Sequence, residues 1–403
     1  MKHIVYFFLL AITFQCSNPS AKGETKIDLT DDSEEATETA VIQTIKEKPK
    51  KRTFVYKSFT CVKELIDACT KNDLEKATFL INSGCDVNGT VEIGYNAWMS
   101  PLRAGVHHDD TKIAKLLLDA GADPELDLGR LVKPINYGAG YNPETLKLLI
   151  ANGGNVNSFN EGANYQTPLI WAINRGKIEN VKILVQNGAL IDYDTITYEY
   201  IQSPLHRAIK DREYEIAKYL LEQGANPNFK ITEVHEDCYV CPWDIAPIHE
   251  IGLIEDLETA KQFTDLFIEF QADLNITNGY DENVIGHIAP GGNANLAEYL
   301  IEKGVVITDA AVARAAMFQN EKFLEVLLIN GGNPNAYLDR ESALSHAITC
   351  CGDGFNERSQ AKRIKTIDLL LRNGAKPDSI LINLVNKDER FEDVAKLLSQ
   401  YEN

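Results

Sequence analysis

The sequence predicts an all-α fold in which about nine helix-turn-helix units with hairpin-like fingers stack into a solenoid. Three observations support this. A phrase of adjacent aliphatic residues, glycine and a turn-forming Asn-Pro-Asn recurs, as in YLLEQGANPN at 219–228 and VLLINGGNPN at 326–335. Successive turn glycines at 84, 121, 153, 188 and 224 lie 32 to 37 residues apart. Several units also open with Ser or Thr before Pro-Leu. A fixed period of this length indicates a repeat architecture.

The first sixteen residues, MKHIVYFFLLAITFQC, predict an export signal. The apolar run from Ile4 to Phe14 is shorter than the about 20 residues that cross a bilayer, and it suits the core of a signal peptide. A cysteine that closes such a run resembles the signal of a bacterial lipoprotein, which implies cleavage before Cys16 and its lipidation. Gln15 and Thr13 depart from that pattern. Ordinary secretion is the first alternative, and a buried start of the fold is the second.

Residues 17–52 are predicted to form a disordered tether. They hold few large apolar side chains, an acidic run at 31–38 and a basic run at 46–52, so they cannot bury enough surface to fold. A tether of this kind suits a surface anchor, whereas a poorly ordered terminus without a role is the alternative. The repeat solenoid is assigned to residues 53–403.

The unit at 203–228 shows why the repeat takes this form. Ser203 can cap a helix, and Pro204 suits the first helical position, where its missing N–H is harmless. Aliphatic residues between Ile216 and Leu221 recur at three-to-four spacing and predict a buried stripe. Gly224 can end that helix in the left-handed conformation. Helices of about nine residues are marginal alone in water, so neighbouring units must supply the stability.

The motif at the start of each unit resembles ankyrin repeats, which have a period of about 33 residues and the pattern T-P-L-H-x-A. Thr167-Pro-Leu-Ile-Trp-Ala and Ser203-Pro-Leu-His-Arg-Ala carry the resemblance, with reduced forms at 100–103, 246–249 and 342–347. It covers nearly all of residues 59–403. It implies a non-catalytic module that binds another protein through its concave face and fingers. It also implies that His206 and His249 bond the backbone between units.

Aromatic residues in the fingers, and the variable place after the T-P-L-H pattern, are the candidate partner-binding positions. Tyr, Trp and Arg dominate protein-binding hot spots. Packing of one finger on the next is the alternative role for about half of the rings. The finger candidates are Trp98, Tyr193, Tyr198, Tyr200, Tyr239 and Trp243. The candidates at the variable place, which the resemblance puts on the concave groove, are Trp171, Arg207, Glu250, His287 and His346.

Eight cysteines at irregular spacing do not predict a disulfide framework, although a pair could oxidise outside the cytoplasm. Cys238 and Cys241 lie in a long insertion near His235, but a structural zinc site takes four ligands. We therefore predict loop cysteines or a local disulfide there, and no metal or other cofactor. A metal or redox protein using these two cysteines is a less favoured function. Cys350 and Cys351 begin a second insertion and are expected to be buried thiols.

The formal net charge of −19, from 40 basic and 59 acidic residues, argues against a nucleic-acid partner. It favours a basic protein partner, and it suggests an alternative function as an immunity or inhibitor protein that neutralises a basic toxin or enzyme. The acidic excess can equally serve to keep an exposed solenoid soluble. No catalytic constellation can be assigned from spacing. We expect a monomeric, non-catalytic protein that contacts a membrane only through an N-terminal lipid, in the outer membrane or periplasm, or else is secreted.

Overall fold

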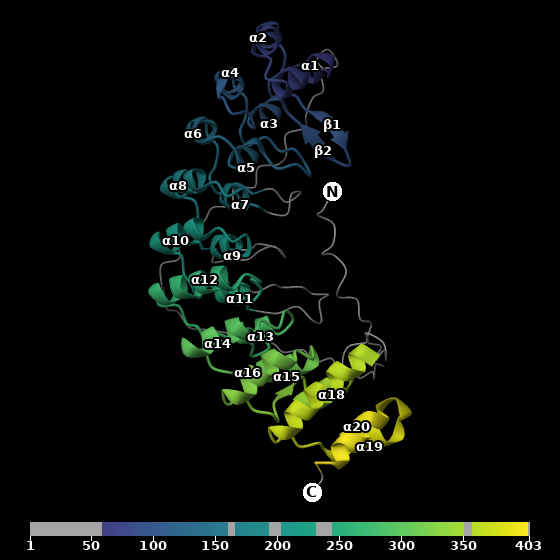
Figure 1. Ribbon diagram of the computed structural model, residues 1–403. Coiled ribbons are helices and arrows are strands. Elements are labelled where there is room, and N and C mark those ends of the chain that lie inside the picture. Colours follow the sequence, from purple (N-terminus) through teal and green to yellow (C-terminus); the bar gives the residue numbers. More distant parts are fainter. Residues whose placement is uncertain (1–58, 160–165, 193–202, 231–243, 350–356, 402–403) are drawn as a thin grey trace, which may run out of the picture. The chain divides into compact units, whose positions relative to one another are not determined.

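The computed structural model describes residues 59–159, 166–192, 203–230, 244–349 and 357–401. The chain divides into two units, Met1–Phe54 and Val55–Asn403, and all described residues belong to the second (Figure 1). The predicted signal peptide with Cys16 and the predicted tether at 17–52 lie outside the described residues. So do Cys238, Cys241, Cys350 and Cys351.

The described helices form ten pairs. The first helices of the pairs are α1 (Phe59–Thr70), α3 (Pro101–Gly105), α5 (Pro134–Gly138), α7 (Pro168–Asn174), α9 (Pro204–Lys210), α11 (Pro247–Ile251), α13 (Val284–Ile288), α15 (Asp309–Met317), α17 (Ala343–Thr349) and α19 (Ser379–Lys387). The second helices are α2 (Leu74–Asn82), α4 (Lys112–Asp119), α6 (Pro143–Ala151), α8 (Ile178–Gln186), α10 (Tyr214–Glu222), α12 (Leu257–Glu269), α14 (Ala294–Glu302), α16 (Glu321–Ile329), α18 (Glu357–Arg372) and α20 (Glu392–Ser399).

Successive pairs stack on one another in two rows (Figure 1). Each first helix from α1 to α15 contacts the next first helix, and the second helices contact one another from α2 through α10 and again from α12 through α20. The strands of the described ranges form two short antiparallel hairpins, β1 (Val91–Gly94) with β2 (Ala97–Met99) and β3 (Tyr337–Leu338) with β4 (Glu341–Ser342). The predicted all-α stack of helix-turn-helix units is therefore confirmed.

The number of units differs slightly from the expectation. The sequence predicts about nine units closed by one helix near the end of the chain, whereas the structure has a tenth pair, because α19 precedes α20. The side chain of Asp378 accepts a hydrogen bond from the Leu381 backbone N–H at 2.7 Å and caps α19. This helix lacks the Pro-Leu opening of α3, α7 and α9, and so the motif alone does not reveal it.

The unit at 203–228 has the predicted geometry. The Ser203 hydroxyl accepts the backbone N–H of His206, and Pro204 is the first residue of α9. The apolar stripe of α10 is buried, with Leu220 at 0% exposure. Gly224 follows with a φ of +94°, a conformation that costs L residues about 1–2 kcal/mol. One continuous apolar core runs from Leu65 in α1 to Leu398 in α20, so every pair buries its stripe against its neighbours.

An asparagine ladder joins the turns of neighbouring units. The Asn157 side chain donates to the Gly188 carbonyl at 2.9 Å and accepts the Leu190 N–H at 2.8 Å. Asn88, Asn275 and Asn335 make the same two bonds to the turn of the next unit. In the repeated phrase, the last asparagine therefore links one unit to the next, in addition to turning the chain.

A disulfide joins Cys61 in α1 to Cys85 in the turn after α2, with 5.8 Å between their Cα atoms. The sequence allowed for one oxidised pair of cysteines but did not indicate which cysteines form it. Cys69 is a buried free thiol, and burial raises its pKa to about 12. Such a thiol stays protonated and unreactive.

Within the described ranges, none of the helices combines the length and the apolar character needed to cross a membrane. In the same ranges there is no group of three or more His, Cys, Asp or Glu side chains placed to hold a metal ion.

Replacing Asn157 with alanine removes both bonds of one ladder step. At about 0.5–1.5 kcal/mol for each hydrogen bond, we expect the free energy of unfolding to fall by about 1–3 kcal/mol. Urea denaturation of the variant measures this loss.

Asn152→Ala is the matched control, because the Asn152 side chain bonds only to Leu148 of its own helix, at 2.8 Å. Equal losses in the two variants would contradict a special contribution of the ladder.

Candidate partner-binding face

The first helices and the turns that follow them form one side of the stack, which we call the first-helix face. Trp171 of α7, Arg207 of α9 and Glu250 of α11 are half-buried there, on three successive first helices that contact one another. Arg207 is already paired, with its Nε 2.6 Å from the Asp211 carboxylate. The variable place therefore does reach the surface in the middle of the stack.

The other two candidates at the variable place make contacts within the stack. The Nε2 of His346 donates to the Leu338 carbonyl at 3.0 Å, and the residue is buried. His287 accepts a hydrogen bond from the Asn278 amide at 3.2 Å and stacks on His249, with ring centroids 4.7 Å apart. The structure thus corrects the placement of His346 on an exposed groove, because its ring is buried. The half-buried ring of His287 is engaged by Asn278 and His249.

Trp98 belongs to the β1–β2 finger. Its Nε1 donates to Asn96 Oδ1 at 3.3 Å, and its backbone N–H donates to the Leu128 carbonyl in the turn of the next unit at 3.1 Å. This placement agrees with the alternative of finger-to-finger packing. The other finger candidates lie outside the described residues: Tyr193, Tyr198, Tyr200, Tyr239 and Trp243.

The structure also brings together a group of residues that the sequence analysis did not connect, which we call the Arg-Tyr-Trp cluster. It consists of Arg103 from α3, Tyr137 from α5, Tyr141 from the turn after α5, Trp171 from α7, and Arg175, the residue that ends α7. The Arg103 guanidinium lies 3.0 Å from the centroid of the Tyr137 ring. The Arg175 guanidinium lies 5.3 Å from the Tyr141 ring and 5.8 Å from the Trp171 ring.

The rings of the cluster also contact one another. The Tyr141 hydroxyl donates to the Tyr137 hydroxyl at 2.8 Å, and the Tyr137 and Trp171 rings meet edge to face at 6.0 Å. Cation–π and edge-to-face contacts of this kind favour one arrangement of the side chains. The cluster is therefore an ordered patch on the surface of three stacked units.

Burial and positive charge shape the electrostatics of the cluster. Burial lowers the pKa of the Arg103 guanidinium, although Tyr137 beside it favours the charged form. Burial raises the pKa of Tyr137, but the hydrogen bond from Tyr141 and the charges of Arg103 and Arg175 together bring it below its usual value. Burial and the hydrogen bond to Tyr137 raise the pKa of Tyr141.

Two polar atoms of the cluster are buried without a hydrogen-bond partner, Arg103 Nε and Trp171 Nε1. Both are donors, and a buried donor without an acceptor costs about 1–3 kcal/mol. Unsatisfied polar groups of this kind are uncommon in folded proteins. They therefore mark the cluster as the part of the first-helix face most in need of an added acceptor.

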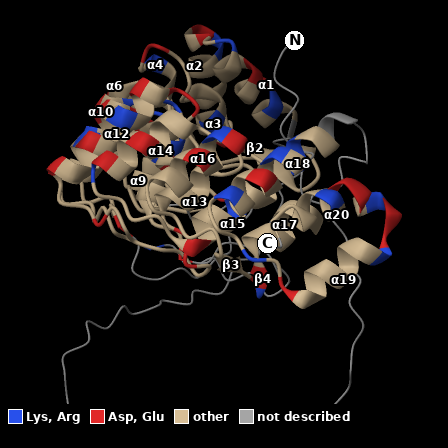
Figure 2. Ribbon diagram, turned by 60° about the horizontal axis from the view of Figure 1, so that its bottom comes forward, with Lys and Arg blue, Asp and Glu red and all other residues tan. Residues whose placement is uncertain are grey.

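The second helices carry a different kind of surface. Figure 2 shows Lys/Arg and Asp/Glu segments side by side along helices such as α10, α12 and α14. Several pairs are one helical turn apart, as for Lys147 with Glu144 at 2.7 Å and Lys182 with Glu179 at 3.0 Å. Exposed pairs at this spacing contribute only about 0.2–0.5 kcal/mol each. This side of the stack is a neutralised, solvated surface.

His206 and His249 have the structural role that the repeat resemblance implies. His206 Nε2 donates to the Ile245 carbonyl at 2.9 Å, and its Nδ1 accepts the Ser203 hydroxyl at 2.7 Å. His249 Nε2 donates to the Ile276 carbonyl at 3.1 Å, and its Nδ1 accepts the Ala246 backbone N–H at 2.9 Å. With one ring nitrogen donating and the other accepting, each ring must be neutral.

Burial also keeps these two rings neutral. It lowers the pKa of His206 from 6.5 to about 3 and that of His249 from 6.5 to about 4, although their backbone hydrogen bonds act in the opposite direction. Neither ring is available as a general base, since both nitrogens are engaged inside the stack.

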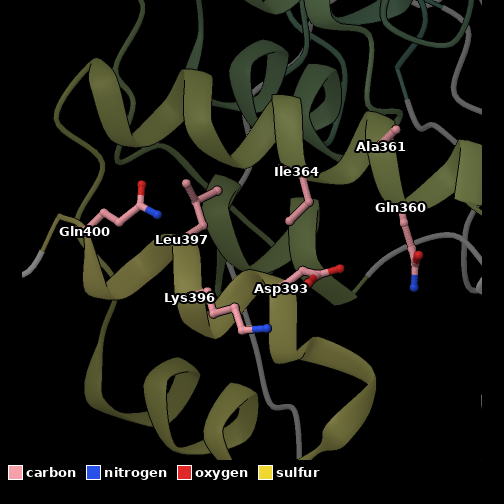
Figure 3. A pocket seen from close by; sticks show the side chains of 7 residues that line it. All are labelled: Gln360, Ala361, Ile364, Asp393, Lys396, Leu397 and Gln400. Atoms are coloured by element: carbon pink, nitrogen blue, oxygen red, sulfur yellow. The ribbon is translucent and has the colours of Figure 1, made fainter.

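A shallow hollow of about 480 Å³ lies between α18 and α20 (Figure 3). Ile364 and Leu397 line it together with Asp393 and Lys396, and the two charged residues are exposed to solvent. Lys396 already pairs with Glu392 at 2.8 Å. Because this hollow presents no unsatisfied or buried functional group, we do not take it as the functional site.

Comparison with known proteins identifies the repeats. Residues 135–231 match the family model described as ankyrin repeats in three copies. A putative ankyrin repeat protein of Acanthamoeba polyphaga mimivirus is 38% identical over 82 residues, which are 20% of this chain and 49% of that protein. Alpha-latrotoxin-Lg1a of Latrodectus geometricus is 27% identical over 154 residues, 38% of this chain and 10% of the toxin. The chain thus spans about half the length of the first of these relatives and a tenth of the second.

Two solved structures are also among the proteins to which this chain is similar. The ankyrin repeat domain of human ASB11 is 21% identical, with a TM-score of 0.47, and the match covers 60% of this chain and 98% of that domain. The ankyrin repeat domain of Bcl-3 is 21% identical, with a TM-score of 0.44, and the match covers 55% of this chain and 92% of that domain. With the repeat model and the stacked helix pairs, the fold is an ankyrin-repeat solenoid.

The lowered pKa values of His206 and His249 predict a loss of stability in acid. The unfolded chain takes up a proton on each histidine near pH 6.5, whereas the folded protein does so only near pH 3 to 4. The contribution of these neutral rings to the stability of the folded protein is therefore complete above about pH 6.5 and declines as the pH falls toward 4. Each of these two histidines should lower the free energy of unfolding by about 2 kcal/mol between pH 7 and pH 5.

Denaturant melts at several pH values test this. His206→Gln should have a shallower dependence of stability on pH than the parent, because the proton of His206 is no longer taken up on unfolding. Parallel pH profiles for the parent and the variant would contradict the assigned role.

Proposed function

We propose that the protein is a non-catalytic interaction module that binds another protein through its first-helix face. The observation that carries this proposal is the Arg-Tyr-Trp cluster, an ordered group of half-exposed rings and guanidinium groups with unsatisfied donors. Trp, Tyr and Arg carry most of the binding energy in protein interfaces, near the centre of the contact. An ankyrin-repeat solenoid supports such a surface on rigid stacked helices.

The arrangement of the face supports recognition of a macromolecule. Trp171, Arg207 and Glu250 continue the row of half-buried side chains from the cluster along α7, α9 and α11. A contact that follows this row would extend across several units, as expected for a protein partner.

We further propose, from the sequence, that the protein is exported and held in the cell envelope by a lipid on Cys16. The apolar run before Cys16 and the polar segment at 17–52 support this. Secretion without a lipid is the alternative.

A partner of basic character, such as a toxin that this protein would neutralise, is not the candidate we favour. That alternative draws on the net charge of −19 over the whole chain. The cluster, by contrast, presents two guanidinium groups, Arg103 and Arg175, which would repel a basic surface placed directly on it.

Trp171 provides the test of the interaction module. In crosslinking of the full chain in its native cell, Trp171→Ala should lower partner capture about tenfold or more, as expected for a hot-spot residue. Trp171→Phe retains most of the packing and serves as the second variant, and thermal melts of both establish that they fold.

Phe79→Ala is the matched control, because Phe79 is an aromatic residue of a second helix and is 69% exposed. Capture of the same partner at the parent level by Trp171→Ala would refute the assigned face.

Cys16 provides the test of the anchor. Cys16→Ala should move the protein from the membrane fraction to the soluble envelope or secreted fraction, and mass spectrometry of the parent should find a lipid on the cysteine. If the intact mass of the parent protein shows that the first sixteen residues are all retained, the proposal of a lipid anchor is contradicted.

A further inference from the structure

We propose that the Arg-Tyr-Trp cluster binds an acidic peptide segment of the partner protein, with a carboxylate held between Arg103 and Arg175. This inference rests on the proposed function and names the chemistry of the partner at that surface. It proposes an acidic partner surface, whereas the net charge of the whole chain suggests a basic one.

The first argument is the absence of counter-ions at the two arginines. Arg207, Arg314 and Arg390 each form an ion pair with a carboxylate of the chain. In the part of the chain that the structure describes, no carboxylate pairs with Arg103 or Arg175. The interactions that act on Arg103 come from Tyr137, Tyr141 and Arg175. In a chain with 59 acidic and 40 basic residues, two neighbouring arginines without an acidic partner form a local positive site.

The second argument is the orientation that the rings impose. The Arg103 guanidinium lies against the face of Tyr137, and Arg175 lies near the Tyr141 and Trp171 rings. A guanidinium that stacks by its flat face still has the N–H donors around its edge. These donors match the two oxygens of a carboxylate. The rings thus restrict the two arginines in advance, which reduces the entropy that a ligand must offset.

The third argument is the kind of group left unsatisfied. Arg103 Nε and Trp171 Nε1 are both donors, so they require an acceptor. An ionised carboxylate is an acceptor only. Arg175 is exposed and can make the first contact, while the Arg103 side chain is half-buried and lies deeper. A basic side chain, which can only donate, satisfies none of these groups.

The extent of the cluster favours a peptide over a small ion. Its residues come from three successive first helices, α3, α5 and α7, which contact one another in the stack. The aromatic rings supply apolar surface beside the charge, which suits an extended segment with alternating acidic and apolar side chains. Nucleic acid is disfavoured, because a polyanion would approach a chain of net charge −19.

A direct titration tests the inference. The probe is a fluorescein-labelled peptide of about 12 residues with alternating Glu and Leu, titrated with the full chain and followed by anisotropy at low salt. We expect the Glu peptide to bind about tenfold or more tightly than the same peptide with Gln in place of Glu. Binding should weaken as salt is added, since the attraction is screened. Arg175→Gln and Arg103→Gln should each raise Kd about tenfold, or about 1.4 kcal/mol.

Arg372→Gln is the matched control. It removes a guanidinium of a second helix, away from the first-helix face, that Asp368 already neutralises at 2.7 Å, so its Kd should stay within about twofold of the parent. A second version of the full chain carries neutral polar residues in place of the acidic run at 31–38, so that the labelled peptide is compared with and without that run. Thermal melts establish that each variant is folded.

Three results would overturn the inference. They are equal binding of the Glu and Gln peptides in both versions of the chain, equal losses in Arg372→Gln and Arg175→Gln, and binding of a matched phosphoserine peptide but not of the Glu peptide. The proposed function is judged separately by partner capture with the Trp171 variants. If the partner is captured but the acidic peptide does not bind, only the proposed partner chemistry is refuted. If the peptide binds but no protein is captured, the proposed interaction module is refuted and the peptide chemistry is retained.

Discussion

Burial of apolar stripes between neighbouring helix pairs is the interaction on which the other features of this protein depend. The helix α9 has seven residues and α10 has nine, so neither is long enough to be stable in water alone. Each buries its stripe against the adjacent units, and the core consequently runs without interruption from α1 to α20. Buried polar groups are satisfied in the same way, since His206 and His249 reach the backbone of the following unit.

The candidate site is a product of this stacking. Arg103, Tyr137 and Trp171 are about one period apart in the sequence, and they meet because α3, α5 and α7 lie in contact. The same row of helices uses comparable positions for different purposes. In α9 and α11 a histidine links two units, whereas in α3 the corresponding place holds Arg103, which turns to the surface cluster. Comparable positions along one face thus serve a link between units in two repeats and the candidate site in another.

Local signals made the repeat predictable from the sequence. Ser203, Pro204 and Gly224 each act on the backbone of their own unit, so their roles can be deduced from neighbouring residues alone. The contacts of His287, the burial of His346 and the contacts of Arg103 depend on how separate units face one another. The asparagine ladder did leave a signal, because asparagine recurs four residues after the turn glycine, as in Gly153 and Asn157. Its bonding partner in the next turn becomes visible only with the three-dimensional arrangement.

The asparagine ladder has a mechanical consequence. Its steps connect one turn to the following turn and not to any more distant one, as Asn88 does with the turn at Gly121 and Asn335 with the turn at Gly374. Tension applied along the rows would therefore be carried by these junctions in series, each under the same load. The stack would lengthen by yielding at its weakest junction first, and it could transmit a pull between an anchor and a bound protein while the remaining units keep their form.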